Sequence, residues 1–94
     1  MHSNIYYMKY VIFNQKGLLH PVLFANHTSH AQITIEGAEP VSAGFVRFSK
    51  TLHLPECYGF SDSLGLESRK EDEEIIRKWQ FNSGTADFRD FDTL

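Results

Sequence analysis

The chain has 94 residues, 41% hydrophobic and 22% charged, proportions that are typical of a globular protein and exclude an intrinsically disordered one. Its net charge of −3 argues against a dedicated nucleic-acid-binding protein, because such proteins neutralise phosphates with an excess of Lys and Arg. No apolar run approaches the roughly 20 residues that cross a bilayer, and the first residues do not resemble a secretory signal. The single cysteine, Cys57, suits a reducing compartment, so we expect a cytoplasmic protein without a membrane partner.

Strand signals dominate the first sixty residues. Residues 5–14 and 18–25 are rich in β-branched and aromatic residues and flank the turn NQKG, so they predict a β-hairpin. After the polar break NHTSH, where a short helical turn is expected, two further strands are predicted over 31–37 and 41–54. Gly44 inside the latter indicates a bulge or a close approach of two backbones. A strand fragment around 57–60 is followed by an ordered loop.

A helix is predicted over residues 69–80. The stretch SRKE matches a capping box, in which Ser68 and Glu71 exchange hydrogen bonds with each other's backbone amides. The helix dipole stabilises the acidic residues 71–74, which lie in the first turns of the predicted helix. The helix carries one narrow apolar face, made of Ile75, Ile76 and Trp79.

This order of elements predicts an α+β fold: a small antiparallel sheet of three to five strands with one C-terminal helix packed on it. We expect a single domain over residues 1–94, with residues 82–94 forming a short tail.

Three of the five histidines fall within eleven positions, in HPVLFANHTSH. On a helical turn His27 and His30 point the same way and can chelate, with His20 as a third ligand for a zinc-like ion. His53 and Cys57 are more distant ligand candidates. Turn-forming or buried neutral histidines explain the same pattern without a metal.

We find no catalytic motif, and therefore expect a protein that is not an enzyme. In an extended segment His53 and Cys57 are too far apart for the imidazole to activate the thiol. The loop over 59–66 lacks the glycine and lysine pattern of a phosphate-binding loop. A buried, inert Cys57 is the simpler interpretation.

Aromatic residues make up 14% of the chain, and such residues are enriched both in small cores and at protein interfaces. The tail alternates acidic and aromatic residues in DFRDF, which is typical of a docking segment but also of a tail that packs back on the sheet. Trp79, Phe88 and Phe91 are the candidate partner-binding residues. An exposed sheet edge would favour a homodimer.

Residues 40–48 (PVSAGFVRF) followed by 61–76 (SDSLGLESRKEDEEII) resemble short, functionally uncharacterised proteins of bacteriophages and prophages. In that pattern a PVSAGF-like strand precedes an SLGLxSRPEDxxLI-like loop and helix, and Lys70 stands here in place of the proline. The resemblance implies a small phage or prophage accessory protein in the cytoplasm of a bacterial host. It also implies that Met8 is the equivalent start and that residues 1–7 are an N-terminal extension.

Three functional hypotheses remain open. The leading one is a small non-enzymatic protein-interaction or regulatory module that binds a protein partner or a second copy. The alternative is a His-based metal-binding protein or a small metal-dependent hydrolase. The third is single-stranded nucleic-acid binding through the strand that holds Tyr6, Tyr7, Lys9 and Tyr10, because aromatic rings and cations together stack bases.

Overall fold

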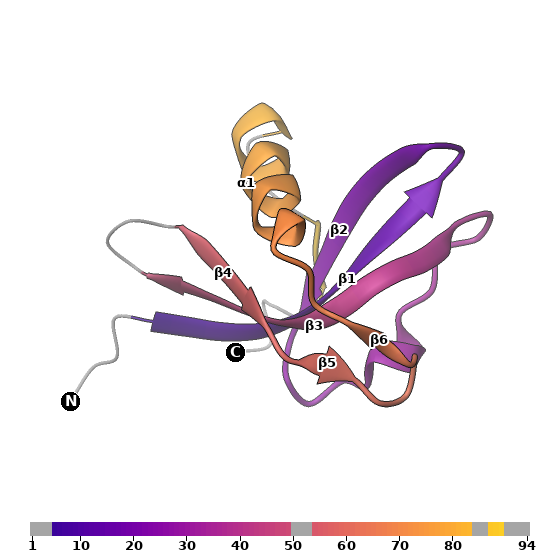
Figure 1. Ribbon diagram of the computed structural model, residues 1–94, viewed down its shortest axis with the longest axis horizontal. Helices are drawn as coiled ribbons and strands as arrows, with labels where there is room; N and C mark the ends of the chain where they lie inside the picture. Colours follow the sequence, from indigo (N-terminus) through magenta and orange to yellow (C-terminus); the bar gives the residue numbers. More distant parts are fainter. Residues whose placement is uncertain (1–4, 50–53, 84–86, 90–94) are drawn as a thin grey trace.

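The structure is a computed structural model, which describes residues 5–49, 54–83 and 87–89 (Figure 1). Its main sheet has the strand order β4-β3-β1-β2-β7. The first four of these strands pair antiparallel and have the bounds β1 Ile5–Gln15, β2 Leu18–Phe24, β3 Glu39–Ser49 and β4 Pro55–Tyr58. With the helix α1, Glu71–Ser83, they confirm the predicted α+β class.

The predicted hairpin of β1 and β2 is confirmed. Lys16 and Gly17 at its turn have φ angles of 53° and 87°, the positive values that a tight two-residue hairpin turn requires. The Asn14 side chain accepts a hydrogen bond from the Gly17 amide at 2.9 Å. Asparagine and glycine therefore set the register in which Val11 lies opposite Val22.

The prediction of a strand over 31–37 is wrong. That segment begins with a 3-10 helix, η1, His30–Gln32, and continues without strand pairing. Ser29 caps η1 by accepting from the Ala31 amide, and the Gln32 side chain accepts from the Ser29 amide at 2.9 Å. Local capping by serine and glutamine thus outweighs the alternation of apolar residues in this segment.

Two other boundaries differ from the sequence-based expectation. The loop expected after residue 60 contains a short hairpin, β5 Phe60–Ser61 with β6 Leu66–Glu67, which pairs antiparallel beside the main sheet. In the predicted tail, β7 Asp87–Arg89 pairs parallel with β2, so the main sheet is mixed and not purely antiparallel. Residues 84–86 and 90–94 of the tail lie outside the described residues.

The helix begins at Glu71, two residues later than predicted, and its capping residue also lies one position later than predicted. The Arg69 amide donates to Asp72 Oδ2 at 2.9 Å, which is the side-chain half of a capping box. The amide of Ser68, the predicted cap, instead donates to the Gly59 carbonyl at 3.0 Å. Within the described residues no helix is long and apolar enough to cross a bilayer.

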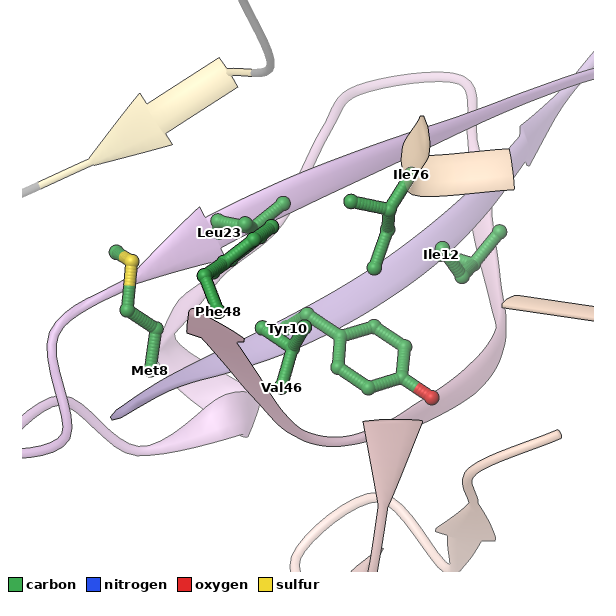
Figure 2. Close-up of a cluster of buried hydrophobic side chains, with 7 residues drawn as sticks. All are labelled: Met8, Tyr10, Ile12, Leu23, Val46, Phe48 and Ile76. Carbon is green, nitrogen blue, oxygen red and sulfur yellow. The ribbon is translucent and has the colours of Figure 1, made fainter. Parts of the chain in front are cut away.

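The core has one layer on each face of the sheet. On the face covered by α1, the buried side chains are Met8, Tyr10, Ile12, Leu23, Val46, Phe48 and Ile76, and Figure 2 shows Ile76 pointing from the helix into this cluster. Ile75 and Trp79 pack beside it, as the apolar helix face predicts. On the opposite face a second buried cluster comprises Val11, Phe13, Val22, Phe24, Ile33 and Ala43.

Gly44 marks a close approach of two backbones, as predicted. A Cβ atom at this position would lie 2.7 Å from the Tyr58 carbonyl oxygen and 3.1 Å from Ser68 Cβ. Any side chain would therefore force apart β3 and the chain that leaves β4. The glycine lets the chain pass from β4 to β5 close against β3, where Ser68 from the connection between β6 and α1 also lies.

Candidate functional site

The most central of the predicted metal ligands, His30, is a buried packing residue. Its Nε2 lies 2.8 Å from the Gly44 carbonyl oxygen, and only 5% of the residue is exposed. The rings of Phe24 and Phe45 meet the imidazole edge-on at 5.5 and 5.7 Å. Burial lowers the pKa of His30, partly opposed by the Gly44 hydrogen bond, so the ring is neutral and donates to the carbonyl.

The other two histidines do not join it. His20 is half-buried, with its ring 6.3 Å from Phe13 and 5.6 Å from Trp79, whereas His27 is exposed. In the described part of the chain no three His, Cys, Asp or Glu residues lie together in a group that could hold a metal ion. The spacing of His27 and His30 therefore does not produce a convergent ligand set in this fold, while His53 lies outside the described residues.

The predicted partner-binding residues fall in different settings. Trp79 is partly buried and packs against the helix-side cluster, and its ring meets His20. Phe88 belongs to β7 and lies opposite Leu23 of β2, so the backbone of the tail joins the sheet there. Phe91 lies outside the described residues.

A fully buried carboxylate, Asp72, lies between the helix start and the sheet. Its Oδ2 accepts from the Tyr10 hydroxyl at 2.6 Å, and its Oδ1 accepts from Ser42 Oγ at 2.9 Å. Arg69 Nε donates to Oδ1 at 3.1 Å, and Nη2 lies 3.0 Å from the same oxygen in an ion pair without hydrogen-bond geometry. Together with the Arg69 amide, four donors satisfy a charge whose side chain has no exposed area.

Cys57 extends this buried polar group but is not an activated nucleophile. Its thiol lies near the Tyr10 hydroxyl, and burial raises the pKa of the thiol to about 12. Burial and then the bond to Asp72 raise the pKa of Tyr10 above its ordinary range. Both groups therefore stay protonated near neutral pH, and the arrangement stabilises the fold without presenting a thiolate.

The outer edge of β4 is closed to strand pairing. The outward-pointing amide of Cys57 donates to Glu73 Oε2 of α1 at 2.9 Å. Because amides alternate in direction along a strand, the backbone nitrogen of Pro55 also points outward, and it carries no hydrogen. The edge thus offers an added strand no free donor from these two residues, which is a common protection against edge-to-edge association.

The opposite face of the same end of the sheet is exposed. Tyr10 and Val46 point toward α1, so their neighbours along the strands point to the other face. Two cross-strand rows result there: Tyr7, Arg47 and Glu56 in one, and Lys9, Phe45 and Tyr58 in the next. We call these six residues the open face.

Contacts among the open-face side chains hold them in place. The Arg47 guanidinium lies 5.2 Å from the centre of the Tyr58 ring and forms an ion pair with Glu56. The Tyr58 ring stacks on Phe45 at 5.7 Å, with an angle of 24° between the planes. Tyr7 is 50% exposed and Tyr58 37% exposed, so two aromatic rings face solvent, and Arg47 packs over one of them.

Neither the buried Asp72 group nor the complete open face could be identified from the sequence. Asp72 belongs to the run EDEE, in which four acidic residues are indistinguishable until the helix phase is known. Tyr7 and Lys9 were recognisable as an aromatic and cationic strand, but Arg47, Glu56 and Tyr58 join them only through the register of three strands.

Comparison with known proteins identified no relative in which these sites can be compared. No protein-family model matches it, and comparisons with curated proteins and with solved structures found no significant match either. The function is therefore inferred from the geometry of the chain itself.

Proposed function

We propose that this protein is a small non-enzymatic interaction module that binds a protein partner through the open face. The observation that carries the proposal is the exposed set of Tyr7, Arg47 and Tyr58 on adjacent strands of the sheet, in which Arg47 lies over the Tyr58 ring. Tyrosine and arginine, together with tryptophan, are enriched among the residues that dominate the free energy of protein–protein binding.

The rigidity of the open face supports this role. Ordering a flexible side chain on binding costs roughly 0.5–1.5 kcal/mol, and that cost lowers affinity. Here the Phe45 ring stacks against the Tyr58 ring, and Glu56 forms an ion pair with the Arg47 guanidinium in the unbound chain. The open face is thus preorganised, in contrast to a surface of loosely held lysines.

Charge favours a protein partner over a nucleic acid. The Arg47 charge is neutralised by Glu56, and Lys9 already donates to the Thr28 carbonyl at 2.9 Å. With a net charge of −3, the chain would also repel a phosphate backbone at long range. Stacking of bases on Tyr7 and Tyr58 is accordingly the weaker use of the same surface.

A second copy of the chain is one form that the partner can take. Closure of the β4 edge by Pro55 and Glu73 argues against a dimer formed by strand addition at that edge. A homodimer would instead pair two open faces, with each Tyr58 against the other copy.

The proposal is tested by isolating complexes of the tagged protein from the cells that encode it. The double variant Tyr7→Ala/Tyr58→Ala removes both exposed rings of the open face. Leu18→Ala/Leu19→Ala is the matched control, because these side chains are 73% and 40% exposed. Leu18 pairs with Gln15, eight residues along β1 from Tyr7, a separation of about 26 Å.

We expect the wild type and the control to retain one stoichiometric protein partner, and the open-face variant to lose it while remaining folded. Native mass spectrometry assigns the partner as a different protein or a second copy. A complex that survives loss of both tyrosines contradicts the proposal. A complex that nuclease treatment abolishes shows that the open face binds nucleic acid instead.

A further inference from the structure

A second surface feature is lined by residues of the β5–β6 hairpin, by Val41 of β3 and by Arg69 just before α1. It is a shallow hollow with a volume of about 490 Å³. The lining of this hollow includes Val41, Phe60, Asp62, Leu66, Glu67 and Arg69. None of them belongs to the open face.

The hollow joins an exposed aromatic ring to carboxylates. Phe60 is 59% exposed, and it lies directly opposite Glu67 across the β5–β6 ladder, so both side chains leave the hairpin on the same face. Asp62 follows β5 at the rim. Among the residues that the structure describes, neither Asp62 nor Glu67 forms an ion pair.

The one cation of the lining, Arg69, does not neutralise these two carboxylates. Its guanidinium is already paired with the buried Asp72 at 3.0 Å and lies 3.5 Å from Glu71. The hollow therefore keeps two uncompensated negative charges next to an aromatic ring. Val41 and Leu66 also line the hollow and add apolar wall, since each is only partly buried against a core cluster.

We propose that this hollow binds a lysine or arginine side chain of a basic protein segment. Such a side chain has an apolar stem and a charged end, and the hollow offers apolar wall for the first and carboxylates with a ring for the second. The charge of the whole C-terminal half agrees, because residues 51–94 contain five Lys and Arg against ten Asp and Glu. This acidity attracts a basic segment before contact.

The inference goes beyond the proposed function and does not depend on the open face. Its test uses a small probe, N-acetyl-arginine amide, followed by amide chemical shifts in the full chain. The neutral, nearly isosteric N-acetyl-citrulline amide reports binding that does not need the positive charge. Failure here leaves the open-face experiment unaffected, and the reverse also holds.

Matched variants assign the site. Asp62→Asn/Glu67→Gln removes the two charges of the hollow, and Glu36→Gln/Glu39→Gln removes two exposed charges elsewhere. We expect saturable shifts over residues 60–69 in the wild type and control, and affinity lowered about fivefold to tenfold in the hollow variant. If the double variant unfolds, the single variant Glu67→Gln replaces it in the titration. Its expected change in the logarithm of the affinity is about half that of the double variant.

Three results would overturn the proposal outright, and a fourth would move the site elsewhere. The three are a wild type without saturable shifts up to the solubility of the probe, equal binding of the citrulline probe, and equal affinity of the hollow variant and its control. Shifts that map to the open face would likewise reassign the cation site to that surface.

Discussion

Two aromatic–charged pairs among the residues that the structure describes differ chiefly in burial. Tyr10 and Asp72 lie between the sheet and α1 with no exposed area, whereas Tyr58 and Arg47 lie on the open face. The buried carboxylate is surrounded by four donors because an unsatisfied charge there would cost several kcal/mol. The exposed pair has water as an alternative partner, so its contacts contribute little to folding and remain available for binding.

The largest expected effect is on the buried pair. Asp72→Ala leaves Tyr10, Ser42 and Arg69 without their shared acceptor. We expect the free energy of unfolding to fall by about 3–5 kcal/mol, measured by urea denaturation. Glu74→Ala, which removes an exposed ion pair with Arg77 in the same helix, serves as the control, with a change below about 1 kcal/mol. Equal effects of the two variants would show that the Asp72 network is not a determinant of stability.

The thiol next to Tyr10 provides a second measure of burial. The pKa of Cys57 is raised from its ordinary 9.0 to about 12, so the thiolate fraction near pH 8 falls by roughly three orders of magnitude. We expect iodoacetamide to alkylate the folded protein about a thousandfold more slowly than the urea-unfolded chain. Alkylation at similar rates would mean that the thiol is accessible and its neighbourhood is polar.

Removing only the hydroxyl of the buried pair should have an intermediate effect. Tyr10→Phe keeps the ring in the core but removes the donor of the 2.6 Å bond to Asp72 and the contact with Cys57. We expect a loss of about 1–3 kcal/mol in the free energy of unfolding. A change below about 0.5 kcal/mol would indicate that Ser42 and Arg69 satisfy the carboxylate by themselves.

His30 makes the buried region sensitive to acid. Because its folded-state pKa lies below the unfolded value of 6.5, only the unfolded chain takes up a proton as the pH falls below that value. Stability from this group is therefore present above about pH 6.5 and is lost toward pH 5. We expect His30→Gln to be less stable than the wild type at pH 7 but to show a shallower decline between pH 7 and 5. Parallel declines in urea denaturation would assign the acid sensitivity to other groups.

The smallest effect on stability is expected for the exposed pair. Arg47→Ala removes an ion pair and a cation–π contact that are both open to solvent. We expect the free energy of unfolding to change by less than about 1 kcal/mol, measured by urea denaturation as above. A loss comparable to that of Asp72→Ala would mean that the open face is part of the folding core.

The sequence predicted the fold class, the β1–β2 hairpin and the apolar face of α1 because each depends on residues close together in the chain. The hairpin follows from Asn14 and Gly17, and the helix face from Ile75, Ile76 and Trp79. The sequence did not predict which distant strands pair. It also did not predict which of two competing local signals prevails. The alternation over 31–37 favours a strand, but Ser29 and the His30 contact with Gly44 favour a turn, and only the assembled sheet decides between them.

The predicted sites differ from the observed ones for the same reason, because strand pairing brings together residues that are distant in the chain. Three histidines close in sequence were candidate metal ligands, yet one packs in the core, one against Trp79 and one faces solvent. The open face instead unites residues from β1, β3 and β4 that are up to fifty-one positions apart, counted from Tyr7 to Tyr58. Proximity along the chain was thus a poor guide to proximity on the surface.

The most direct test compares Tyr10→Phe with Tyr58→Ala in two measurements, the midpoint of urea unfolding and the amount of partner that co-purifies. We predict that Tyr10→Phe lowers the midpoint and keeps the partner, whereas Tyr58→Ala keeps the midpoint and loses the partner. If Tyr58→Ala lowers the midpoint as much as Tyr10→Phe and leaves partner binding unchanged, the open face is a structural surface and the proposed function is wrong.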